Sequence, residues 1–259
     1  MYPDMDSILL QVIYIVVPTL SLIRNALIVY ATVVSRKLRN PCNIFIALIA
    51  LGDVMFMFSF FISAATYNRY NDHQIPQDIC VYLYIVPIFG QCFSAMLLLN
   101  LAIDRLLSLT ASWHNNLINQ YAKVYITVQV LPACIFGGIV NVLAILVRDP
   151  DKNVICTMVA PLLPSIGGAC VKIVTTVCIL LIICYSLFGL LVRNLRMNTE
   201  SMRAVYRSLV VITVSIVFGN FCAMGFAMTD DFDNPSIFHI QLTGLFMSFG
   251  TSVNFFAYY

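Results

Sequence analysis

The chain has 259 residues, of which 61% are hydrophobic and only 10% are charged. Soluble domains carry about 25% charged residues, so this composition excludes a protein whose surface faces water on all sides. The formal net charge of +2 is too small to indicate nucleic acid as a partner, and the charged residues cluster between long apolar runs.

The apolar runs predict seven membrane-spanning helices. A helix crosses the hydrocarbon core of a bilayer with about 20 residues, and seven runs reach that length. In chain order they cover residues 8–34, 44–66, 79–109, 124–147, 165–192, 205–228 and 236–259. Turn signals such as Asn40-Pro41, Asp149-Pro150 and Asn234-Pro235 separate them. We therefore expect one all-α domain over residues 1–259, a seven-transmembrane helix bundle.

The basic residues between the spans predict the orientation of the chain. The loops after spans two, four and six contain three Lys or Arg residues, Arg69, Arg148 and Lys152. The loops after spans one, three and five, together with the span ends beside them, contain nine: Arg36, Lys37, Arg39, Arg105, Lys123, Arg193, Arg196, Arg203 and Arg207. Because cytoplasmic loops are enriched in Lys and Arg, we expect an extracellular N-terminus in a multi-pass protein of the plasma membrane.

The third predicted span has a distinctive residue at each end. Cys80 begins it, and Asp104-Arg105 ends it about 25 residues later, or roughly 37 Å along a helix. The two ends therefore lie on opposite sides of the membrane. Cys156 is the only loop cysteine on the side of Cys80, so we expect a Cys80–Cys156 disulfide there. The alternative is two unpaired cysteines.

Several polar side chains interrupt the apolar spans. Asp53 lies deep in span two, Asn25 lies at a similar depth in span one, and Asn254 lies in span seven. A charged group inside a membrane is expensive and marks a functional site by default. The three side chains predict a polar cluster that shares a proton, a cation or water; the alternative is hydrogen-bonded packing between helices. Arg24 either pairs with Asp53 or extends along its own helix toward water.

The order and spacing of these residues along the chain match those of a known receptor class. The matching residues are Asn25, Asp53, Cys80 to Asp104-Arg105, and Asn254-Phe255-Phe256-Ala257-Tyr258. In this the chain resembles the rhodopsin-like G-protein-coupled receptors. Within that class it looks like the divergent nematode chemosensory receptors of the Srsx type. The resemblance covers the whole chain and implies two partners besides the bilayer, an extracellular ligand and a heterotrimeric G protein on the cytoplasmic face.

The resemblance also implies roles for individual residues. Asp104 and Arg105 correspond to the Asp-Arg-Tyr motif, with Leu106 in place of Tyr. In the family the acid holds the Arg at rest and releases it toward the G protein when span six swings outward. Tyr185 and Tyr258 look like the tyrosines that pack around that Arg in the active state.

The same resemblance assigns a role to the polar cluster inside the spans. Asp53 and Asn254 are similar to the relay that binds sodium and water between the ligand pocket and the cytoplasmic face. Arg24 replaces the small Gly of the family and competes with sodium for Asp53, which argues against a sodium ion. We expect no other cofactor and no metal. Phe255 stands where the family has Pro, and span six lacks Trp and Pro.

Two ligand classes are disfavoured. Span seven has no Lys for a retinal Schiff base, and Pro87 stands where amine receptors carry Asp. The polar candidates for the ligand pocket, among the apolar outer halves of the spans, are Tyr84, Gln91, Asn141, Lys172, His239 and Gln241, and Pro87 is an apolar candidate beside them. A mostly apolar pocket with a few polar groups suits a small organic molecule or short peptide. For each residue the alternative is packing or, for Lys172, extension toward water.

The leading hypothesis is a signalling receptor rather than an enzyme, which binds its ligand outside and activates a G protein inside. A small ion- or proton-coupled transporter that uses Asp53 is the alternative from another class, although no paired repeat is visible in the two halves. A third hypothesis is a receptor-like protein that has lost signalling, because of the altered motifs in spans six and seven.

Overall fold

The computed structural model describes residues 8–36, 39–69, 73–110, 112–162 and 167–194, with short stretches at 211, 214–215, 217–222, 242–246 and 248. Within these residues, five helices are long and apolar enough to cross a membrane. They are α1 (Ile8–Val34), α2 (Pro41–Arg69), α3 (Gln77–Thr110), α4 (Ser112–Leu146) and α5 (Gly167–Asn194). They overlap the first five predicted spans. The spans predicted at 205–228 and 236–259 lie mostly outside the described residues, apart from helical stretches at 217–222 and 242–246.

The start of α2 follows from its capping residues. The side-chain oxygen of Asn40 accepts a hydrogen bond from the backbone N–H of Asn43 over 2.8 Å. This satisfies a donor that the first turn of a helix leaves unpaired. Pro41 fits the first helical position because it lacks an N–H and its φ angle is already helical. The helix therefore begins at Pro41, three residues before the apolar run that starts at Ile44.

The start of α4 differs more from the prediction. The apolar run begins near Val124, but the helix begins at Ser112. Tyr121 interrupts it with non-helical angles (φ −128°, ψ 41°), so α4 consists of a short helix before Tyr121 and a long one after it. The apolar run predicts only the long part, because hydropathy does not detect a short polar helix between two spans.

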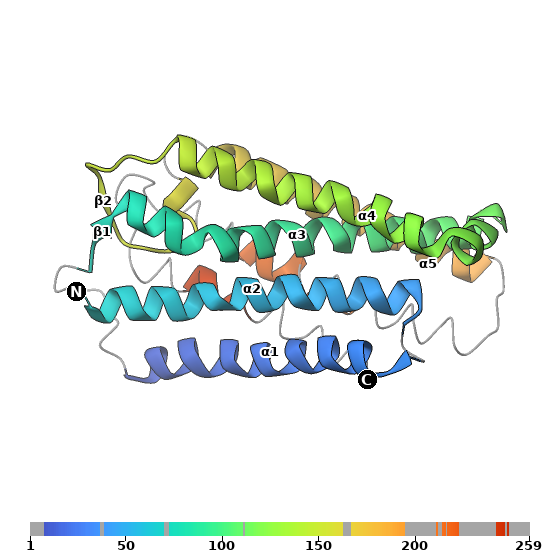
Figure 1. Cartoon of the computed structure of the whole chain (residues 1–259), viewed down its shortest axis with the longest axis horizontal. Coiled ribbons are helices and arrows are strands. Elements are labelled where there is room, and N and C mark those ends of the chain that lie inside the picture. The colour runs from blue at the N-terminus through green and yellow to red at the C-terminus, as the bar shows by residue number, and fades with distance from the viewer. Residues whose placement is uncertain are drawn as a thin grey trace.

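The helices are arranged around α3. It contacts α2, α4 and α5, whereas α1 contacts α2. Figure 1 shows α1, α2, α3 and α4 side by side, with α5 behind them. Consecutive helices run antiparallel, so the α1–α2 and α3–α4 connections lie at one end, and the α2–α3 and α4–α5 connections lie at the other.

Two glycines allow α2 and α3 to approach closely. A Cβ atom added to Gly90 on α3 would lie 2.5 Å from the carbonyl oxygen of Gly52 on α2 and 2.6 Å from the Cβ of Met55. Small residues at a helix contact let two backbones approach, which is how membrane helices gain packing energy. The contact fixes α2 against α3 beside Asp53.

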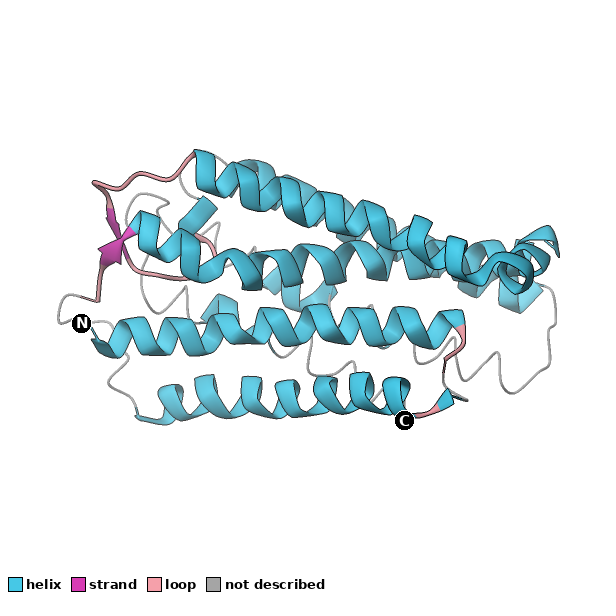
Figure 2. Cartoon of the chain, in the orientation of Figure 1, coloured by secondary structure: helices cyan, strands magenta, loops and turns pink. Residues whose placement is uncertain are grey.

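A compact cap closes the end of the bundle where α3 begins. Strand β1 (Ile75–Pro76) pairs antiparallel with β2 (Asn153–Val154), as the magenta arrows in Figure 2 show, and a short 3-10 helix η2 (Ala160–Leu162) contacts α3. The predicted disulfide between Cys80 and Cys156 is confirmed, with an S–S distance of 2.07 Å. We call this end of the bundle the disulfide end.

The outward faces of the helices are apolar. Large exposed side chains include Val16, Leu20 and Leu27 on α1 and Val128, Leu131 and Ile139 on α4. Exposed apolar stripes of this length on several helices are unfavourable in water and suit a lipid environment. The chain is thus a multi-pass membrane protein.

Candidate functional site

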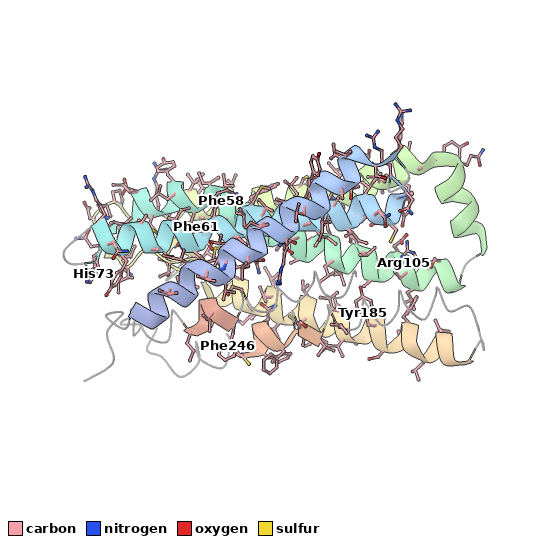
Figure 3. The ribbon with its side chains drawn as sticks, turned by 90° about the horizontal axis from the view of Figure 1, so that it is seen from below. Phe58, Phe61, His73, Arg105, Tyr185 and Phe246 are labelled. Carbon is pink, nitrogen blue, oxygen red and sulfur yellow. A yellow bond between two sulfur atoms is a disulfide. The ribbon has the colours of Figure 1, made fainter. Side chains whose placement is uncertain are left out.

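Asp104 and Arg105 form an ion pair near the end of α3. The Nε of Arg105 donates to Oδ2 of Asp104 over 2.9 Å, and its Nη2 donates to the same oxygen over 2.5 Å. The Asp104 side chain is 2% exposed and the Arg105 side chain 22%. Burial removes competing water and strengthens the attraction. Figure 3 shows Arg105 at the opposite end of the bundle from His73. We call the end that contains Arg105 the Arg105 end.

A tyrosine on α4 holds the other oxygen of the acid. The hydroxyl of Tyr125 donates a short hydrogen bond to Oδ1 of Asp104. The amide Nε2 of Gln129 donates to the Tyr125 hydroxyl over 3.3 Å, and Nδ2 of Asn100 donates to the carbonyl oxygen of Gln129 over 2.7 Å. The ring of Tyr125 packs edge-on against Phe45 of α2 at 6.2 Å between centroids. Asp104 is therefore fixed from two helices.

Sequence reasoning named Asp104 and Arg105 but missed Tyr125 and Gln129. A signal was present, because Asn100 and Asp104 are four residues apart on one span, and Tyr125 and Gln129 are four residues apart on the next. Residues with this spacing share one helix face. Because the two helices face each other and run antiparallel, Asn100 can lie opposite Gln129 while Asp104 lies opposite Tyr125.

Tyr185 of α5 packs in the same hydrophobic core as residues of α3, the helix that carries the ion pair. It is 4% exposed and belongs to one buried cluster with Leu98 and Leu101 of α3. Figure 3 places Tyr185 and Arg105 in the same half of the bundle, away from His73. Tyr258, the second tyrosine expected near Arg105, lies outside the described residues.

The polar cluster predicted inside the spans is described in part. Asn25 and Asp53 are each 3% exposed and lie on α1 and α2, which contact each other. The Nδ2 of Asn25 donates to the hydroxyl of Ser21 in its own helix over 3.3 Å. Asn254, the third member, falls outside the described residues. Across the described part of the chain, no group of three His, Cys, Asp or Glu side chains is placed to hold a metal ion.

A family model described as "Serpentine type 7TM GPCR chemoreceptor Srsx" matches residues 18–259. The chain belongs to this family. A stretch of 55 residues is also 42% identical to the C-C chemokine receptor type 8 of Macaca mulatta, and covers 21% of the chain and 15% of that receptor. The Srsx assignment agrees with the resemblance read from the motifs, and with the apolar helices and the disulfide.

In this Srsx-family chain, the ligand-pocket candidates differ in whether their polar groups are already hydrogen-bonded within the protein. Tyr84 is fully buried, and its hydroxyl lies 2.5 Å from the hydroxyl of Ser63 and donates to the carbonyl oxygen of Ser59 over 3.0 Å. Because Tyr84 donates to Ser59, the Ser63 hydroxyl is the donor in its contact with Tyr84, and the carbonyl oxygen of Cys156 lies 3.4 Å from that same Ser63 hydroxyl as a second acceptor. Tyr84 thus links α2, α3 and the loop that carries the disulfide, so its hydroxyl already has partners inside the protein.

The other candidates are spread over α3, α4 and α5. Pro87 is buried and Gln91 is half-buried on α3, whereas Lys172 is exposed near the start of α5. Asn141 on α4 donates through Nδ2 to the carbonyl oxygen of Ile85 over 3.0 Å, and its buried Oδ1 has no hydrogen-bond partner among the described residues. Gln241 and His239 lie outside the described residues.

Proposed function

We propose that this chain is a plasma-membrane receptor that binds a small organic molecule or short peptide at the disulfide end and activates a heterotrimeric G protein at the Arg105 end. The observation that carries the proposal is the buried Asp104–Arg105 ion pair, at the end of α3 opposite the disulfide. A guanidinium held by a neighbouring acid is available to a partner once the pair separates. The Srsx family supplies the class of partner.

The distribution of charge supports this orientation. Arg36 and Arg39 lie in the α1–α2 connection and Lys123 lies at the start of the long part of α4, so all three share the Arg105 end. At the disulfide end, the described basic residues in and beside the connections, Arg69, Arg148 and Lys152, are balanced by acids that include Asp149 and Asp151. Among the described residues in and beside the connections, the excess of basic over acidic side chains is thus at the Arg105 end. Because basic residues favour the cytoplasmic side, the Arg105 end faces the cytoplasm and the N-terminus lies outside. We take the number of spans as seven, which with an extracellular N-terminus puts the end of the last span on the cytoplasmic side.

Ligand binding acts by shifting a two-state equilibrium of the bundle. A ligand stabilises whichever state binds it more tightly, so a ligand specific for the active state increases the fraction of molecules with Arg105 released. Asn25, Asp53 and Asn254 form the polar relay between the two ends, and Tyr185 and Tyr258 pack around the released Arg105. Sodium at Asp53 is not required for this mechanism.

The ligand is bound by the less occupied polar groups of the disulfide half. Tyr84 is engaged by Ser59 and Ser63, which leaves Gln91 and Lys172 as the polar contacts among the described candidates. Pro87 supplies apolar contact beside them, and Gln241 is the candidate that the predicted seventh span contributes. A pocket of this kind orients a ligand with few hydrogen bonds and gains most of its affinity from apolar contact.

The test is nucleotide exchange on a mixture of heterotrimeric G proteins by the full chain in lipid nanodiscs, with a panel of small odorants and short peptides. Arg105→Ala should abolish stimulated exchange. Arg39→Ala is the matched control, since Arg39 is an exposed basic residue at the same end, and it should retain exchange. Equal exchange by wild type and Arg105→Ala would contradict the mechanism. A solute flux that requires Asp53, without any exchange, would favour the transporter instead.

A further inference from the structure

The two carboxylate oxygens of Asp104 accept hydrogen bonds from side chains on two different helices. Oδ2 of Asp104 accepts both hydrogen bonds from Arg105 of α3, and Oδ1 accepts the hydroxyl of Tyr125 from α4. A carboxylate that accepts hydrogen bonds at both oxygens has a fixed plane, so Tyr125 determines which way Asp104 presents Oδ2. Hydrogen bonds to an ionised acceptor are roughly twice as strong as those between neutral groups.

The tyrosine is itself held in place. Its hydroxyl accepts a hydrogen bond from Gln129 one turn further along α4 and donates to Asp104, so the three groups form a directed chain. Chains of this kind polarise and strengthen each bond in a medium of low dielectric constant. A second hydrogen bond between the two helices, from the Asn100 side chain to the backbone carbonyl oxygen of Gln129, keeps α3 and α4 in register.

The position of Tyr125 also links the ion pair to the connection between α3 and α4. The helix is interrupted at Tyr121, one turn before Tyr125, and the short helix Ser112–Gln120 lies on the other side of that interruption. Tyr125 is therefore in the first turn of the long part of α4. A partner that moves the short helix acts on α4 next to the residue that holds Asp104.

We propose that Tyr125 is a positioning residue of the resting receptor, which holds Asp104 so that it retains Arg105 and which transmits movement of the short helix Ser112–Gln120 to that pair. The inference rests on the proposed function at the Arg105 end. The Tyr125 bond belongs to the resting state, because it is made to the same carboxylate that holds Arg105. Removing the hydroxyl leaves a buried carboxylate oxygen without that donor and raises the free energy of the resting state.

Tyr125→Phe is the test variant, because it removes only the hydroxyl and keeps the ring that packs against Phe45. Ligand-independent nucleotide exchange by the full chain in nanodiscs should rise about tenfold, which corresponds to about 1.4 kcal/mol. Tyr121→Phe is the matched control, since this exposed tyrosine lies one turn away on the same helix, and its exchange should equal that of wild type. Exchange that stays at or falls below the wild-type rate in Tyr125→Phe overturns the inference.

A double variant separates positioning from a general loss of structure. Asp104→Ala removes the acceptor and should raise ligand-independent exchange, after which adding Tyr125→Phe should change nothing further. A second rise in the Asp104→Ala background would mean that Tyr125 acts by another route, and would overturn the inference. No rise in Asp104→Ala itself would count against the proposed function, because the acid would then not restrain Arg105.

Hydrogen–deuterium exchange provides a readout that needs no G protein. Backbone amides of Ser112–Tyr121 should exchange faster in Tyr125→Phe than in Tyr121→Phe, because the first turn of the long part of α4 has lost its hydrogen bond to α3. Equal uptake in the two variants overturns the inference, whatever the nucleotide assay shows. Faster uptake with no nucleotide exchange by any protein, wild type included, reduces Tyr125 to a structural contact and contradicts the proposed function as well.

Discussion

Gly52 and Gly90 bring α2 and α3 so close together that a Cβ atom on Gly90 would lie 2.5 Å from the carbonyl oxygen of Gly52. That oxygen belongs to backbone, which cannot rotate away as the end of a side chain can. The contact sets the spacing between the helix that carries Asp53 and the helix that carries Asp104 and Arg105.

Gly90→Ala should therefore destabilise the protein. The added methyl group forces the two backbones apart, and overpacking of this kind typically costs about 1–3 kcal/mol. The measurement is the unfolding midpoint in nanodiscs by circular dichroism. Gly138→Ala on α4 is the matched control, because a Cβ there meets nothing within 4 Å, and Ala favours a helix by roughly 1 kcal/mol over Gly. Equal midpoints for both variants would show that α2 and α3 separate without strain.

Tyr84→Phe distinguishes a structural role from ligand contact at a residue that the sequence placed in the pocket. The variant keeps the buried ring and removes a hydroxyl that bonds to Ser63 and to the carbonyl oxygen of Ser59. We expect a loss of about 1–2 kcal/mol in unfolding free energy, with the order of ligand potencies unchanged. Tyr30→Phe, at an exposed tyrosine, should have no effect. An unchanged stability with altered ligand preference would instead place the Tyr84 hydroxyl in the pocket.

The helices were predictable and the hydrogen bonds between them were not. An apolar run of about 20 residues identifies a span by itself, so α1, α2, α3 and α5 lie close to their predicted bounds. The bond from Tyr125 to Asp104 depends on the register of α4 against α3, which no property of either helix alone determines. The partners of Tyr84 were hidden for the same reason, since Ser59 and Ser63 lie on another helix.

The predicted disulfide was accessible to sequence reasoning for a simple reason. Orientation placed Cys80 and Cys156 on one side of the membrane, and no other loop cysteine lay there. By contrast, the early start of α4 at Ser112 was not predicted, because the residues before Tyr121 are too polar to register as part of a span. The proposed roles of Asp53, Tyr185 and Arg105 remain predictions.

Removal of the disulfide should loosen the cap without disordering the bundle. The double variant Cys80→Ser/Cys156→Ser should lose about 2–4 kcal/mol of stability, because the bridge restrains the unfolded chain. Reductant should lower the unfolding midpoint of wild type to that of the double variant and leave the variant itself unchanged. Cys170→Ser, at a half-buried free thiol on α5, is the control and should respond to reductant as wild type does. A wild-type midpoint that is insensitive to reductant would contradict a stabilising role.

Gln77 should control the order of the loop between α4 and α5 independently of the disulfide. Its buried side chain donates to the carbonyl oxygen of Ala160 over 3.1 Å and accepts from the backbone N–H of Asp149 over 3.3 Å, so it ties both ends of that loop to the start of α3. Gln77→Leu fills a similar volume and loses both bonds. We expect amides between Asp149 and Leu162 to exchange hydrogen roughly tenfold faster, equal to about 1.4 kcal/mol of local opening.

The global unfolding midpoint of Gln77→Leu should fall only slightly, because the Cys80–Cys156 bridge still connects the loop to α3. Gln120→Leu, at an exposed glutamine of α4, is the matched control and should leave exchange in the loop unchanged. If Gln77→Leu alters neither loop exchange nor ligand potency, the disulfide and the β1–β2 pairing suffice to hold the cap, and the two side-chain bonds of Gln77 contribute nothing to its order. Faster loop exchange together with weaker ligand binding would show that the cap itself forms one wall of the ligand site.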